Sequence, residues 1–473
     1  MKHLILLFAG LWLILEVTAF IRFPKHGAMS PSLARLADAP PHRVIEPYRN
    51  AYFFLIGFAA GPSFEPAQVG YEIWVESRDT AAGTRFDYDK PGRFDLHVTL
   101  PLRQTVPAWE ADDDPITAFR AKESSIDISS DRHRELLKRY DRCLGMPFDD
   151  WGFSLRAVPR YEDVITAHRL YIAGGFAQSL TLGMDRLYKE LGFWRLVLRE
   201  ASTITTKVIA QVVIRDDATL LSRMLSRPSI DKAILARVMP LVVPLSIDEY
   251  SLRWPIQHQI ALSTRDRSGA PAPSRPDKQP DPAETWLTAA AHLPPDAFRN
   301  IEHPTNGSHL SKLFAARQTE DLYAAYYDEL IRVSGSRGDR TPRLREVDGK
   351  MGRNVVERFL TPMLQEPGWE LFLSQLLETD AHLRLTALQT QLRKPSTTPS
   401  VPARLAEFGS QYFDPFTGLP MLWSPTQRKL YSVGRDRLDD GGDASFDIAV
   451  PAVVSVSHPS PLSLSPSFGM RRR

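Results

Sequence analysis

The longest apolar stretch of the chain lies at its N-terminus. Leu4–Leu15 is an unbroken apolar run, and Val17–Ile21 continues it beyond Glu16. Together these residues approach the length that a helix needs to span a bilayer. Residues 1–23 are therefore predicted to form a transmembrane anchor, which would hold the rest of the chain outside the cytoplasm.

A cleavable signal peptide explains the same segment. Lys2 supplies a basic start, Leu4–Leu15 a hydrophobic core, and Val17–Ala19 the small residues before a cleavage site. Glu16 favours this interpretation, because a carboxylate inside the bilayer costs roughly 2–3 kcal/mol. Phe20 favours the anchor because it lengthens the span. The anchor predicts a single-pass protein of the bacterial inner membrane with its bulk in the periplasm, and cleavage predicts a secreted or periplasmic protein.

Helical periodicity dominates the chain behind a Pro-rich stretch at residues 24–47, which is predicted to be a stalk. Residues 48–262 are expected to form a helical domain that starts with two short helices broken at Gly61-Pro62. Its longer helices are expected at Asp131–Leu144, Glu162–Leu180, Thr203–Ile214 and Asp217–Leu225, with one more that begins at Met184. The helix that begins at Met184 carries an apolar stripe of Leu187, Leu191, Trp194 and Leu198. Long helices joined by short turns pack as antiparallel hairpins.

The predicted fold class is mainly α, built from antiparallel helical hairpins with a small C-terminal β-hairpin. The hairpins resemble a tetratricopeptide-type stack, although no consensus repeat recurs at a fixed period. Residues 263–295 are rich in proline and polar residues and are predicted to be a linker or long loop. The remaining units are a helical segment at 296–395 with helices at 307–334, 351–366 and Trp369–Leu392, a β-hairpin and acidic loop at 405–450, and a disordered tail at 451–473.

Composition restricts the classes of function without selecting one. With 43% hydrophobic residues the chain can bury a sizeable core, and a net charge of +2 argues against nucleic acid as a partner. Cys143 is the only cysteine, so no intramolecular disulfide forms, whereas exported eukaryotic proteins of this size usually carry several. A bacterial envelope protein is therefore expected. Cys143 itself lies in a helical pattern and is predicted to be buried.

Catalytic motifs are missing from the sequence. It contains no His-Glu-x-x-His, no Gly-x-Ser-x-Gly and no phosphate-binding glycine loop. Asp112–Asp114 and Asp149-Asp150 adjoin turns or helix starts, where helix-capping and surface roles are expected. Gly174-Gly175 falls inside a helix pattern and predicts close helix packing. No catalytic residue and no organic cofactor is predicted.

The most specific motif lies near the C-terminus. Asp-Pro-Phe-Thr-Gly-Leu-Pro at 414–420 is followed by Leu-Tyr-Ser-Val-Gly at 430–434, Asp-Asp-Gly-Gly-Asp at 439–443 and Asp447-Ile448. This order resembles the C-terminal calcium loop of the major pseudopilins of type II secretion, over residues 405–450 only. The N-terminus departs from that family, because no glycine precedes its apolar run. More broadly, the helical body with Asn50-Ala51-Tyr52 and Leu376–Arg393 resembles membrane-anchored proteins of gamma- and betaproteobacteria that have no assigned activity.

The acidic loop has a chemistry of its own. Calcium takes about six to eight oxygen ligands, and clustered aspartates with flexible glycines between them can supply several. The candidate calcium ligands are Asp436, Asp439, Asp440, Asp443 and Asp447. A solvated acidic turn neutralised by Arg435 and Arg437 explains the same residues without a metal. Where calcium binds, its expected role is structural.

Three functions remain open from the sequence. The first is a non-catalytic scaffold or adaptor with an envelope protein as its partner, because stacked helical hairpins offer concave surfaces for proteins. The second is an envelope hydrolase, which convergent carboxylates or histidines with shifted pKa values in a deep pocket would favour. The third is a component associated with a secretion pseudopilus, which rests on the C-terminal motif alone.

Overall fold

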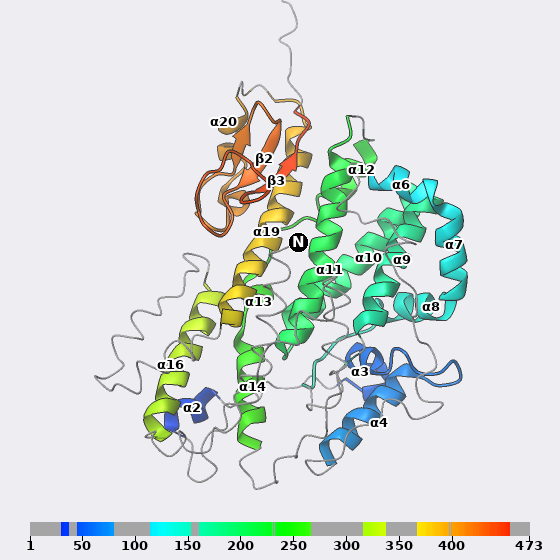
Figure 1. Ribbon diagram of the computed structural model, residues 1–473, viewed down its shortest axis with the longest axis vertical. Coiled ribbons are helices and arrows are strands. Elements are labelled where there is room, and N and C mark those ends of the chain that lie inside the picture. The colour runs from blue at the N-terminus through cyan, green and yellow to red at the C-terminus, as the bar shows by residue number, and fades with distance from the viewer. Residues whose placement is uncertain are drawn as a thin grey trace, which may run out of the picture.

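The computed structural model describes residues 30–36, 45–79, 114–152, 159, 161–228, 230, 232–265, 316–336, 367–396, 398 and 400–454. Over these residues the protein is mainly helical, with one small three-stranded antiparallel sheet at one end of the molecule (Figure 1). The predicted fold class, mainly α with a small C-terminal β-structure, is confirmed. The predicted helix at 351–366 and most of the predicted linker lie outside the described residues.

A short helix occupies part of the predicted stalk. α2 (Pro31–Leu36) packs against α14 (Arg253–Arg265) and α16 (Ala316–Ser334). Leu33 and Leu36 are buried in this contact, so this part of the segment is docked on the body because it carries an apolar face. The apolar N-terminal run lies outside the described residues. None of the described helices is both long and apolar enough to cross a membrane.

The next unit is a tight pair of helices, as the break at Gly61-Pro62 predicts. After η1 (Pro47–Arg49), α3 (Ala51–Ile56) begins at Asn50, whose side chain accepts a hydrogen bond from the Tyr52 amide at 3.0 Å. α4 (Pro66–Asp79) crosses α3 so closely that a Cβ added at Gly70 would overlap the Phe53 carbonyl.

The predicted helix at Asp131–Leu144 is two helices in the structure. α6 (Pro115–Ala121) and α7 (Glu123–Arg132) precede α8 (Arg134–Cys143), and the break falls at His133. There the imidazole folds back, with Nδ1 at 2.8 Å from the Ser129 carbonyl oxygen. Cys143 is buried, as predicted, and burial raises the pKa of its thiol.

Three long helices form the centre of the molecule. α9 (Tyr161–Gln178) and α10 (Leu180–Glu200) make an antiparallel hairpin that turns at Ser179, and α11 (Ile204–Leu225) packs against both. A Cβ added at Gly175 would lie 3.1 Å from the Gly183 Cα, so the close packing predicted for this glycine pair is confirmed there.

α11 is continuous where the sequence analysis expects two helices. Arg215, Asp216 and Asp217 look like a polar break, but the two carboxylates are buried inside the helix bundle. Asp216 is paired with His168 and Arg169 on α9, and burial raises the pKa of Asp217, so neither carboxyl group draws the backbone out of the helix towards water.

The second half of the chain adds a long helix against α11. α12 (Lys232–Val238) and α13 (Ile247–Tyr250) lead towards α14, and α19 (Pro367–Leu392) runs along α11 as predicted for Trp369–Leu392. Gln211 on α11 donates a 2.7 Å hydrogen bond to Thr379 on α19.

The chain closes in a compact C-terminal module, residues 400–454. It contains α20 (Val401–Glu407), η5 (Ser410–Tyr412) and the sheet β1 (Leu422–Ser424), β2 (Lys429–Ser432) and β3 (Ile448–Pro451), in that order. The predicted hairpin pairs Trp423 with Leu430. β3 is an additional strand that extends into the predicted tail, where the Pro451 carbonyl accepts a hydrogen bond from Gln389 at 2.5 Å.

Candidate metal centre

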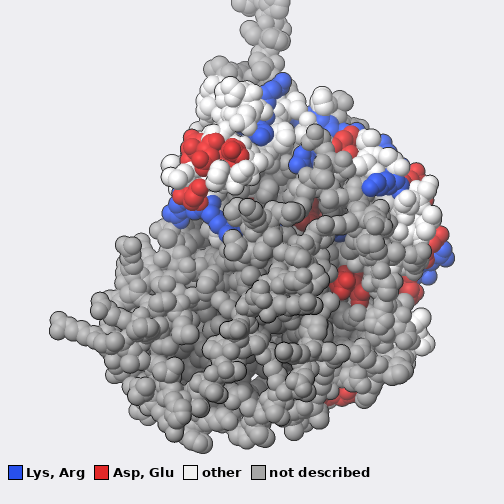
Figure 2. Space-filling view, in the orientation of Figure 1, with Lys and Arg blue, Asp and Glu red and all other residues white. Residues whose placement is uncertain are grey.

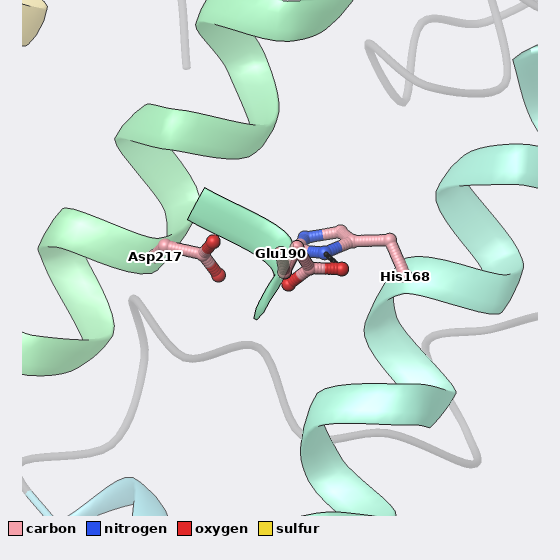
Figure 3. Close-up of side chains that lie close together, drawn as sticks. All are labelled: His168, Glu190 and Asp217. Carbon is pink, nitrogen blue, oxygen red and sulfur yellow. Dashed lines mark ion pairs between the residues drawn. The ribbon is translucent and has the colours of Figure 1, made fainter. Parts of the chain in front are cut away.

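Ionisable side chains from the three central helices meet in the interior. His168 comes from α9, Glu190 from α10, and Asp216 and Asp217 from α11 (Figure 3). His168, Glu190 and Asp217 are completely buried. The helix packing fixes their approach, because each residue lies on a face that also carries apolar core residues such as Leu187 beside Glu190.

The geometry of this cluster is tight. Nδ1 of His168 lies 3.1 Å from Oε1 of Glu190, and Nε2 lies 3.9 Å from Oδ2 of Asp216. One ligand atom each from His168, Glu190 and Asp217 lies within 4.8 Å of the other two. Among the described residues this is the one group of three or more histidine, cysteine and acidic side chains that meets such a distance.

Neighbouring polar groups hold the cluster in place. The Tyr140 hydroxyl donates a short hydrogen bond to Oε1 of Glu190, and Trp194 Nε1 donates to the Tyr140 oxygen at 2.8 Å. Arg169 lies 3.4 Å from Oδ2 of Asp216. These contacts fix Glu190 and Asp216, whereas both oxygens of Asp217 and Oε2 of Glu190 accept no hydrogen bond within the part of the chain that the structure describes.

The electrostatics of the cluster are strongly perturbed. Burial alone would lower the pKa of His168, but Glu190 and Asp216 outweigh it and raise that pKa to about 10. Burial, and then the Glu190 carboxylate, raise the pKa of Asp217 well above its usual range. Burial opposes ionisation of Asp216 as well, yet His168 and Arg169 hold its pKa below the ordinary value. Such opposed shifts within one cluster are typical of functional sites and of buried ion pairs alike.

The predicted calcium loop lies in the C-terminal module, between β2 and β3. Figure 2 shows acidic side chains gathered on this part of the surface. Several of its carboxylates accept hydrogen bonds from nearby backbone amides: Asp436 from Leu438 (3.1 Å), Asp439 from Gly441 (3.0 Å), Asp443 from Ser445 (2.9 Å) and Asp447 from Gly442 (2.7 Å).

Asp447 is the member of this loop that faces the interior. Its side chain is buried, and its Oδ1 has no hydrogen-bond partner among the described residues. Burial raises the pKa of Asp447, and Asp440 and Asp439 raise it further. Gly441 and Gly442 adopt φ angles of 71° and 86°, which glycine reaches without strain and which bend the loop tightly. The loop therefore presents one buried carboxylate oxygen and several exposed ones, but no three of its carboxylates approach one another as closely as the side chains of the buried cluster do.

Other carboxylates have structural roles. Asp114 accepts a hydrogen bond from the Thr117 amide at the start of α6, which confirms the capping role predicted for its cluster. Asp150 is buried instead of lying on the surface, and it accepts hydrogen bonds from the Gly152 and Ser202 amides at 2.8 Å each.

Sequence reasoning missed the buried cluster entirely, although a signal was present. Glu190 stands three residues after Leu187 and four before Trp194, on the apolar stripe of its helix. An acidic residue at such a position indicates a buried charge that needs a partner. The partner, on another helix, cannot be read from one sequence.

Comparison with known proteins adds no relative. No protein-family model, no curated protein and no solved structure matches this chain.

Proposed function

We propose that this protein is a non-catalytic scaffold, tethered to the bacterial inner membrane by residues 1–23 and facing the periplasm, which binds an envelope protein at the end of its body remote from the tether. The observation that carries the proposal is the docking of α2. Ser30 and Leu33 are buried at the contact of α2 with α14 and α16, so only residues 24–29 separate the body from the apolar segment. Fully extended, that link reaches about 20 Å.

Because the link is short, the end of the body that carries α2 would lie near the membrane. In Figure 1, α2, α14 and α16 lie at one end of the long axis and the C-terminal module at the other. The module is held on α19 by an Arg435–Glu378 ion pair at 2.6 Å and by an Arg384 hydrogen bond to the Phe413 carbonyl at 2.6 Å. A body tethered through α2 therefore presents this module away from the membrane.

The surface of the module suits a protein partner. Leu419, Leu438 and Phe446, here called the apolar tip, are 64%, 64% and 61% exposed. Asp436, Asp439, Asp440 and Asp443 are exposed in the same loop region. These side chains offer apolar contact area to a protein partner, and the acidic charges of the same loop region favour a partner with basic side chains.

The test is crosslinking of the full-length protein in native membranes, followed by mass spectrometry. We expect a photocrosslinking residue placed at Leu438 to capture one stoichiometric envelope partner. The triple variant Leu419→Ser, Leu438→Ser, Phe446→Ser should lose at least nine-tenths of that partner. The matched control is Ile128→Ser with Tyr188→Ser, two equally exposed apolar residues on α7 and α10 (63% each). Equal loss in the control, or no partner above background, would reject the scaffold.

We also propose a structural calcium ion at the acidic loop, with Asp436, Asp439, Asp440, Asp443 and Asp447 as candidate ligands. The unpaired buried oxygen of Asp447 supports this assignment. Calcium should raise the melting temperature, and Asp447→Asn should remove the increase. An identical melting temperature in chelator and in millimolar calcium would show that the site is absent.

A second candidate function is a metal-dependent envelope hydrolase. The convergence of His168, Glu190 and Asp217 is its support, since imidazole and carboxylate ligands also serve hydrolytic metal sites. The three side chains are completely buried, so this function also requires the helices to open for a substrate. Hydrolysis of model ester or phosphoester substrates by the metal-loaded protein, lost in Glu190→Gln, would favour this function over the scaffold.

A further inference from the structure

We propose that His168, Glu190 and Asp217 bind one divalent transition-metal ion between α9, α10 and α11. The proposal rests on the convergence of three ligand types from three helices and is independent of the scaffold function. In Figure 3 the Asp217 side chain points towards the His168–Glu190 pair, so that the three polar groups face one another.

The distances suit a metal. Ligand atoms about 2.1 Å from a metal, at angles between a right angle and a tetrahedral one, lie roughly 3.0–3.4 Å apart. The 3.1 Å between His168 Nδ1 and Glu190 Oε1 falls in this interval. The three ligand atoms lie within 4.8 Å of one another. Two ligand atoms on opposite sides of a metal ion are roughly 4.2 Å apart, so binding would draw the side chains together by a fraction of an ångström.

The unpaired carboxylate oxygens are the second observation that points to a ligand. Both oxygens of Asp217 and Oε2 of Glu190 are buried without an N–H or hydroxyl donor among the described residues, and the side chain that Asp217 meets is another carboxyl group, Glu190. A buried polar group without a partner is costly, and most such groups in folded proteins are satisfied. A cation at the centre of the cluster would be a partner for each of these oxygens.

The charges around the site can balance a dication. Asp216 lies 3.9 Å from Nε2 of His168 and is paired with Arg169. A divalent ion that replaces one proton on His168 and one on Asp217 leaves three carboxylates opposite the ion and the Arg169 guanidinium, which is a neutral set. In the absence of metal, the ion pair between His168 and Glu190 holds the same side chains together.

The donor set indicates which metals bind. One imidazole nitrogen and two carboxylates, with no thiolate, suit Mn²⁺, Fe²⁺, Co²⁺ or Zn²⁺ better than Ca²⁺ or Mg²⁺, which prefer oxygen ligands alone. Tyr140 is the positioning residue, because its hydroxyl donates to Glu190 and is itself fixed by Trp194. Such supporting hydrogen bonds are typically worth about 10- to 100-fold in metal affinity.

The experiment is metal titration of the full-length protein in detergent, after chelation and with calcium kept constant. Mn²⁺, Co²⁺ and Zn²⁺ are added separately, and bound metal is measured by elemental mass spectrometry. We expect one equivalent per chain for at least one of them, visible absorption bands with Co²⁺, and a higher melting temperature in its presence. Asp217→Asn should weaken binding at least 100-fold, and Tyr140→Phe about 10-fold.

Asp380→Asn is the matched control. Asp380 is also completely buried, but its carboxylate is satisfied by the Leu245 amide (2.7 Å), the Tyr250 hydroxyl (2.8 Å) and Arg384. This variant should lower stability and leave the affinity for metal unchanged. The proposal is overturned if the wild-type protein binds none of the three metals, or if Asp217→Asn binds as tightly as the wild type. Asp217→Asn removes a buried charge at nearly constant volume, so the variant is expected to fold.

Discussion

Asp150 lies in the loop after α8, where its carboxylate accepts hydrogen bonds from the Gly152 and Ser202 amides. The hydroxyl of Ser202 donates a hydrogen bond to the Asp150 carbonyl at 2.7 Å. This single residue joins the loop to the start of α11. Burial, together with the adjacent Asp149, outweighs the amide hydrogen bonds and raises the pKa of Asp150 from 3.8 to about 6.

This shift predicts a pH dependence of stability. A carboxyl group whose pKa is higher in the folded than in the unfolded state binds more protons when folded, so stability falls as pH rises between the two values. We expect the Asp150 contribution to be fully present below pH 4 and lost by about pH 6, with a total change of about 3 kcal/mol. Asp150→Asn should remove this decline. The measurement is urea unfolding of both proteins from pH 4 to 7, and a constant difference between them would contradict the assignment.

At the scale of elements, α10 sets the spacing of the central helices. A Cβ added at Gly183 would overlap the Phe176 ring on α9, whereas a Cβ added at Gly192 on the same helix meets nothing within 4 Å. The first glycine is required for close approach of α9 and α10. The second has no such role and weakens the helix through its backbone entropy.

Substitution of these two glycines by alanine should therefore have opposite effects. Gly183→Ala should destabilise the protein by about 1–3 kcal/mol through overpacking, and Gly192→Ala should stabilise it by about 0.5–1 kcal/mol. Because the same spacing sets the distance between His168 and Glu190, Gly183→Ala should also weaken metal binding where Gly192→Ala does not. Chemical denaturation and metal titration of the two variants test this. Equal changes in stability and in metal affinity would show that the contact at Gly183 does not set the spacing of α9 and α10.

At the scale of the whole molecule, the proposed tether would act through the link between α2 and the apolar segment. We expect the mature protein to retain residues 1–23, to resist alkaline extraction from membranes, and to be degraded by protease added to spheroplasts. N-terminal sequencing of the purified protein is the direct measurement. A chain that begins at Phe20 and is recovered in the soluble fraction would instead establish cleavage after Ala19.

Regular periodicity predicted the long helices that the structure describes, but not all of their boundaries and not the shorter helices α2, α6, α12, α14 and α20. α19 and the α9–α10 hairpin follow directly from apolar residues at helical spacing. The break at His133 and the continuity of α11 were predicted wrongly. In both places the outcome depends on what a polar side chain contacts. His133 contacts the Ser129 carbonyl in the preceding turn, and Asp216 contacts His168 and Arg169 on another helix.

The sequence by itself determined the helical class, the β-hairpin near the C-terminus and the burial of Cys143, because each depends on local spacing or composition. Tertiary structure alone decided that α2 docks on the body, that β3 completes the sheet, and that His168, Glu190 and Asp217 meet. The physical reason is distance along the chain. Glu190 and Asp217 belong to different helices, and only the packing of those helices brings their charges close enough to share one ion.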